Sequence, residues 1–176
     1  MTASRKTIVA VSIVLIVVLA AVGALMVFNK SPDLLNSEFR VIVTGSMDGE
    51  PQEQYEIKTI PVNSLIAIHK ADSNMASEIK VGDVIGFYSN DVRGNVYHRV
   101  IEIDTVGQSF TTHGDNTHSE EEVAFGDLLG KVVNVSPTAG KVVMYVQSNL
   151  LFVLAVIIIL VIMVEAVSYV LKLSKE

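Results

Sequence analysis

The chain has 176 residues and a net charge of −6, and half of its residues are hydrophobic, with a mean hydropathy of +0.47. A soluble domain of this size is less apolar, so the excess indicates membrane segments. The sequence contains no cysteine, which excludes a disulfide framework, a thiol nucleophile and a cysteine-ligated metal centre. Any catalysis is therefore expected to use an oxygen nucleophile or histidine and carboxylate chemistry.

The apolar residues are concentrated near the two ends of the chain. Thr7–Phe28 holds 22 residues without a charge, which is long enough to cross a bilayer as a helix. A cleaved signal peptide is the alternative interpretation, because small residues lie within this stretch. Residues 150–171 form the second predicted transmembrane helix. The expected organisation is therefore a cytoplasmic N-terminus (1–6), an anchor (7–28), an extracytoplasmic domain (29–149), the second helix and a cytoplasmic tail (172–176).

Charge is distributed unevenly along the chain. Ser31–Ser148 holds 17 acidic against 8 basic residues, a net charge of −9. Nucleic acid is not an expected partner, since phosphate binding requires a basic surface. Basic residues flank the apolar segments instead, with Arg5 and Lys6 before the first and Lys172 and Lys175 after the second. The positive-inside rule then places both termini in the cytoplasm of a multi-pass membrane protein, in the cell membrane or, in a eukaryote, the endoplasmic reticulum membrane.

The segment between the two apolar stretches is rich in short β-branched runs separated by Gly, Asn and Asp turns. The strands predicted in chain order are Phe39–Thr44, Leu65–His69, Val84–Tyr88, Val96–Ile103, Ser109–Thr112 and Leu129–Val135. Helical periodicity is expected only around Ser73–Ile79. The fold class is therefore mainly β, a small folded sheet or barrel between an N-terminal and a C-terminal transmembrane helix.

Two residues of this domain are candidates for a nucleophile and its base. Ser46 follows a predicted strand and Gly45, which permits a sharp turn that exposes the hydroxyl. His98 interrupts a predicted strand, where an imidazole can accept a proton from a nearby hydroxyl at neutral pH. The alternatives are a serine that only forms a turn and a half-buried histidine satisfied by a backbone carbonyl.

A third candidate segment lies between His113 and Glu122. Asp115, or a glutamate of the run Glu120–Glu122, is placed to orient His98. His113, Asp115 and His118 are also an alternative set of metal ligands, although the loop lacks the helical spacing of known zinc motifs, and no metal or other cofactor is expected. The acidic run is otherwise interpreted as a solvated turn.

The order of these motifs resembles type I signal peptidases. TGSM after an N-terminal anchor, then VGDVIGF, YHRVIEI, GDN and LLGKVV before a second apolar segment follow the family order. The resemblance covers about Val41–Val133, and it is closer to the archaeal and endoplasmic-reticulum branch. His98 discriminates here, because the bacterial branch has lysine at the position before Arg99-Val100-Ile101.

The resemblance implies a role for each matching residue. Ser46 is the implied nucleophile, His98 the general base, and Thr44 the position whose hydroxyl helps to bind the oxyanion. Asp115 matches the aspartate of GDN, which supports the site. Relatives carry a further aspartate a few residues later, for which Glu121 is the best match, so the third catalytic residue stays open between these two.

The function expected from the resemblance is a membrane-bound serine endopeptidase that removes signal peptides from secretory preproteins by a Ser-His dyad or Ser-His-Asp triad. Its partners would be preproteins, membrane lipid and the protein-export machinery. Two sequence departures concern the site: proline of the usual SMxP is delayed to Pro51, and the later aspartate is replaced by glutamate. The alternative function is a non-catalytic, membrane-tethered β domain that binds a partner or scaffolds an assembly.

Overall fold

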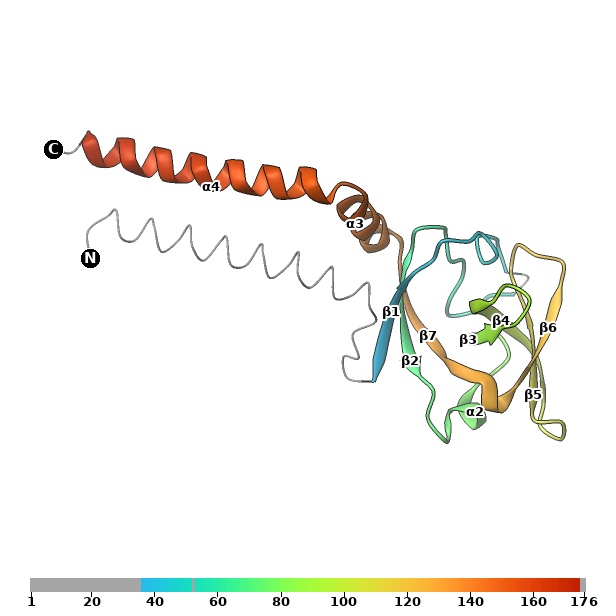
Figure 1. The fold of residues 1–176 in the computed structure, drawn as a ribbon. Helices are drawn as coiled ribbons and strands as arrows, with labels where there is room; N and C mark the ends of the chain where they lie inside the picture. The colour runs from blue at the N-terminus through green and yellow to red at the C-terminus, as the bar shows by residue number, and fades with distance from the viewer. Residues whose placement is uncertain (1–35, 52, 175–176) are drawn as a thin grey trace. The chain divides into compact units, whose positions relative to one another are not determined.

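The computed structural model describes residues 36–51 and 53–174. The anchor predicted at 7–28 and the N-terminal segment 1–6, predicted to be cytoplasmic, therefore lie outside the described residues. The elements in chain order are β1 (Ser37–Val41), β2 (Leu65–Lys70), α2 (Met75–Glu78), β3 (Val84–Ser89), β4 (Gly94–Asp104), β5 (Ser109–His113), β6 (Glu120–Ala124), the 3-10 turn η1 (Phe125–Asp127), β7 (Leu128–Ser136), α3 (Pro137–Ser148) and α4 (Leu150–Leu173) (Figure 1).

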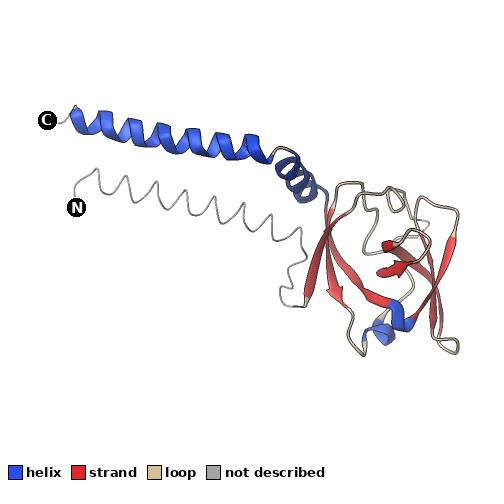
Figure 2. Cartoon of the chain, viewed as in Figure 1, coloured by secondary structure: helices blue, strands red, loops and turns tan. Residues whose placement is uncertain are grey.

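The seven strands form one antiparallel sheet in the order β1-β2-β7-β3-β4-β5-β6. The expected mainly β fold is thus confirmed, and all six predicted strands are present with end points shifted by a few residues. β1 and β6 are the edge strands, and the sheet twists strongly between them (Figure 2). β7 lies in the sheet interior because the chain returns after β6 to pair with both β2 and β3.

Alternating apolar residues of the strands build two buried clusters. The first cluster is formed by residues of the strands β3, β4, β5, β6 and β7 and by residues in and just after α2. Its members are Met75, Ile79, Ile85, Phe87, Val100, Phe110, Val123 and Leu128. The second lies under β1, β2 and the loop after β1 and contains Ile42, Met47, Ile60, Ile66, Ile68, Val84 and Val132. Met47, directly after the candidate nucleophile, is therefore a core residue with 2% of its surface exposed.

Two elements differ from the sequence interpretation. The acidic run is not a solvated turn: it begins the edge strand β6, where Glu121 and Val123 point inward and the other residues are exposed. Three consecutive glutamates conceal this alternation, and pairing with β5 supplies the stability that their composition does not. Helical periodicity is also not confined to residues 73–79, because α3 occupies Pro137–Ser148. Pro137 suits the first turn of a helix, whereas Gly140 lowers the helix propensity of the segment and makes it hard to predict from sequence.

The chain divides into two compact units, one spanning Ser31–Met144 and the other including Tyr145–Glu176. In the second unit α4 is a single helix of 24 residues. Its segment Leu150–Val167 has a mean hydropathy of 3.3 and none of it is buried. By length and composition this helix is able to cross a membrane, as the sequence predicts.

Candidate active site

Ser46 and His98 line the same groove of the β domain, although 51 residues separate them in the sequence. The groove has a volume of about 390 Å³, and its walls come from the segment after β1, the turn between β3 and β4, the start of β4 and the approach to β6. Thr44 and Glu121 line it as well. Four of the five predicted site residues are thus brought to one cavity, and Asp115 is not among its lining residues.

Ser46 is held on a tight turn that projects from the buried core. The N–H of Asp48 donates to the carbonyl of Gly45 at 3.1 Å, so Ser46 and Met47 are the two central residues of a four-residue turn. The Met47 carbonyl accepts from the N–H of Ile60 at 2.9 Å and from the hydroxyl of Thr59 at 3.2 Å. Because the Met47 side chain is buried, the turn is anchored directly beside Ser46, which itself stays half-exposed.

His98 is almost fully buried, with 9% of its surface exposed, and packs edge-on against Phe87 at 6.1 Å between ring centroids. Burial lowers the pKa of His98 below its ordinary value, and the charge of His113 lowers it further, whereas Glu121 and, more weakly, Asp115 raise the pKa. Its Nδ1 atom is buried without a hydrogen-bond partner among the described residues. The neutral imidazole is therefore favoured, which is the form that a general base requires.

The strand register assigns the site residues to two faces of the sheet. Val100 of β4 lies opposite Thr112 of β5, which lies opposite Glu121 of β6. Residues directly opposite in antiparallel strands share a face, and residues two apart in a strand do so too. His98 and Glu121 consequently share one face of the sheet.

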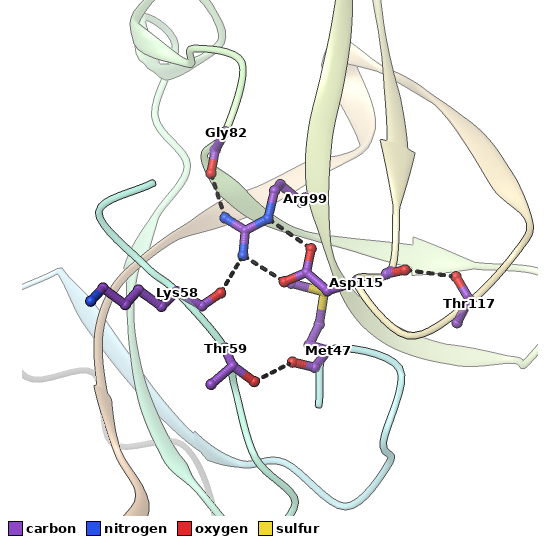
Figure 3. A network of polar contacts seen from close by, with 8 residues as sticks. Met47, Lys58, Thr59, Gly82, Arg99, Asp115 and Thr117 are labelled. Carbon is purple, nitrogen blue, oxygen red and sulfur yellow. Dashed lines mark hydrogen bonds and ion pairs between the residues drawn. The ribbon is translucent and has the colours of Figure 1, made fainter. Parts of the chain in front are cut away.

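Arg99 lies on the other face and binds Asp115. Its Nε donates to Asp115 Oδ1 at 2.8 Å and its Nη2 to Oδ2 at 2.6 Å, with side-chain exposures of 3% and 4% (Figure 3). The guanidinium also donates to the carbonyls of Gly82 and Lys58 and lies over the ring of Tyr55. Both Asp115 oxygens thus accept from Arg99, and no hydrogen bond joins Asp115 to His98 among the described residues.

The segment that carries Asp115 packs directly on the serine turn. The N–H of Asn116 donates to the Ser46 carbonyl at 2.8 Å, and its side-chain amide donates to the Gly45 carbonyl at 3.2 Å. A Cβ atom on Gly114 would lie 2.7 Å from the Ser46 carbonyl oxygen, so only glycine allows this approach. Asp115 and Arg99 therefore fix the backbone that supports Ser46.

The alternative metal site is not assembled by this arrangement. In the part of the chain that the structure describes, no three His, Asp or Glu side chains are grouped to hold a metal ion, so His113, Asp115 and His118 do not form a ligand set. Asp115 is engaged by Arg99, and His118 is exposed.

Three residues with structural roles at the site were not identified from the sequence: Arg99, Met47 and Asn116. The alternation around His98 indicates that Arg99 faces the opposite side, but it does not reveal the carboxylate that it binds. Met47 and Asn116 act through backbone contacts, for which side-chain patterns carry no signal.

The sequence matches no protein-family model, and no curated protein is similar enough to be identified as a relative.

Proposed function

We propose that this chain is a membrane-bound serine endopeptidase that cleaves signal peptides from secretory preproteins. The observation that carries the proposal is the placement of Ser46 and His98 in one groove, with the serine half-exposed and the histidine buried. A serine hydroxyl is a weak nucleophile until a neighbouring base removes its proton, and this pair supplies both groups. The ordered motifs of the sequence support the same assignment.

In the proposed reaction Ser46 Oγ attacks the scissile carbonyl while His98 accepts the hydroxyl proton. The Ser46 N–H and the Thr44 hydroxyl donate to the oxyanion of the tetrahedral intermediate. His98 then gives its proton to the leaving amine, the carbon–nitrogen bond breaks, and an acyl-enzyme remains. A water molecule attacks this ester as His98 removes one of its protons. The bond between the acyl carbon and Ser46 Oγ then breaks, His98 returns the proton to Ser46 Oγ, and the carboxylic acid is released.

Glu121 is the carboxylate that faces His98 in this proposal. It lines the groove on the same face of the sheet, and its charge stabilises the imidazolium that forms as Ser46 loses its proton. Asp115 then acts as a structural residue through Arg99. We therefore propose Glu121 for the third catalytic role, which the sequence leaves open between Asp115 and Glu121.

The groove and the apolar helix support the proposal that the substrate is a peptide that emerges from a membrane. Val43 and Val92 line the groove with 71% and 66% of their surfaces exposed, which offers apolar contacts to a peptide. β1 is an edge strand, so an extended substrate can pair with the backbone that continues from it. α4 would hold this domain at the bilayer surface, with the domain outside the cytoplasm, where the end of a signal peptide is exposed.

The test is cleavage of a preprotein by the purified full-length chain in detergent, followed by sequencing of the new N-terminus. Ser46→Ala should abolish cleavage without changing folding, because it removes only the attacking oxygen. Ser77→Ala is the matched control, since Ser77 is an exposed serine outside the groove.

An acylating inhibitor should label the wild-type chain at Ser46 and leave Ser46→Ala unlabelled. Full cleavage by Ser46→Ala would exclude this nucleophile. A wild-type chain that neither cleaves nor becomes labelled, yet retains bound preprotein, would instead favour a non-catalytic binding domain.

A further inference from the structure

The Gly45–Ser46 peptide group is held from outside the turn by Asn116. Its carbonyl oxygen accepts two hydrogen bonds, one from the Asp48 N–H at 3.1 Å within the turn and one from Asn116 Nδ2 at 3.2 Å. The Ser46 N–H at the other end of this peptide donates to no residue that the structure describes. One end of the group is thus fixed and the other is available to a ligand.

Peptide planarity links the two ends. In a trans peptide the C=O and N–H bonds are antiparallel and lie in one plane, and rotation about the C–N bond is strongly hindered. A hydrogen bond that fixes the direction of the Gly45 carbonyl therefore also fixes the direction of the Ser46 N–H. The Asn116 side chain acts on that N–H without touching it.

We propose that Asn116 is a positioning residue that orients the Ser46 N–H toward the oxyanion of the reaction. This inference rests on the proposed peptidase function and adds a residue to its machinery. Asn116 donates its own N–H to the Ser46 carbonyl at 2.8 Å, so it holds the peptide groups on both sides of the serine. Its neighbour Asp115 is bound by the buried guanidinium of Arg99, which ties the supporting loop to β4.

Oxyanion donors act on the transition state and not on the bound substrate, which gives the proposal a specific kinetic signature. Asn116→Ala removes the side-chain donor but keeps the backbone N–H. It should lower kcat roughly 10- to 100-fold, which is no more than the loss expected when a direct oxyanion donor is removed. KM should stay within about twofold of the wild-type value. The side chain of Asn116 is exposed, so this change should leave the thermal midpoint of unfolding close to that of the wild-type chain.

Two inhibitors separate orientation of the oxyanion donor from a general structural role. A peptidyl boronate forms a tetrahedral adduct with a serine oxygen and places an oxygen in the oxyanion position. The same peptide with a methylene in place of the scissile carbonyl binds without forming an oxyanion. Asn116→Ala should weaken the boronate by about the factor lost in kcat and leave the affinity of the reduced peptide unchanged.

Asn116→Asp tests the donor itself, because it replaces the amide N–H by an acceptor of nearly the same shape and should lower kcat at least as much. Asn134→Asp makes the same change at an exposed position of β7 outside the groove and is the control. Equal loss of affinity for both inhibitors in Asn116→Ala, or an unchanged kcat in that variant, would overturn the inference. If the wild-type chain is active, the proposed function would still stand. A wild-type chain without peptidase activity would overturn both.

Discussion

Arg99 binds Asp115 with two hydrogen bonds of 2.8 and 2.6 Å, and it does so on the face of the sheet opposite to His98. His98 and Arg99, which are adjacent in β4, thus make contacts on opposite faces of the sheet. His98 enters the groove, while Arg99 joins the loop beneath Ser46 to the carbonyls of Lys58 and Gly82.

Loss of this ion pair should reduce stability strongly. Asp115→Asn leaves a buried guanidinium without its counter-charge, which costs about 3 kcal/mol in the free energy of unfolding. Urea unfolding of the full chain in detergent measures this cost. Lys131→Met is the comparison, because the Lys131–Asp83 pair is more exposed and should contribute less than about 1 kcal/mol. Equal losses in the two variants would contradict a structural role for Asp115.

The rate of cleavage should depend on pH through His98. Only the neutral imidazole accepts a proton, and burial lowers the pKa of His98, so kcat/KM should rise with pH to a plateau, with a midpoint below about 6.5. Glu121→Gln removes a charge that raises this pKa, and its midpoint should therefore move to lower pH while the plateau falls. Glu122→Gln, a change at an exposed residue of the same strand, should leave the midpoint in place. An unchanged profile in Glu121→Gln would return the third role to another residue.

The approach of Gly114 to the serine turn should be sensitive to a single methyl group. In Gly114→Ala the added Cβ would lie 2.7 Å from the Ser46 carbonyl, so the loop or the turn must shift. Displacements of this kind at a catalytic group cost about 100-fold in rate. Gly126→Ala meets nothing within 4 Å and should keep wild-type kcat. Wild-type activity in both variants would show that the turn tolerates displacement.

Val92 provides a test of substrate contact in the groove. Val92→Asp places a charge where an apolar peptide side chain is proposed to bind, and it should raise KM at least tenfold with a smaller effect on kcat. Val106→Asp introduces the same charge at a residue 94% exposed outside the groove, and its KM should equal that of the wild-type chain. Steady-state kinetics with a peptide spanning the cleavage site distinguishes the two.

Prediction from sequence succeeded where one residue pattern determines local structure. β3 and β4 follow from β-branched alternation between turn residues, and the alternation also separates His98 from Arg99. Prediction failed where pairing determines structure, as in β6, whose glutamates form a strand because β5 lies beside it. The partner of Arg99 could not be predicted for the same reason: a contact between residues 16 apart depends on a loop path that no periodicity encodes.

The groove is built from residues that lie far apart in the sequence, which affects when it can form during protein synthesis. Asn116 reaches back over 71 residues to Gly45, and Glu121 on β6 completes the wall of the groove. Contacts of this range close long loops of the chain, so they cost more entropy than local contacts and require both distant segments to be present. A nascent chain whose β6 is still inside the ribosome therefore lacks both contacts around Ser46, and the proposed peptidase activity is expected only after β6 has been released.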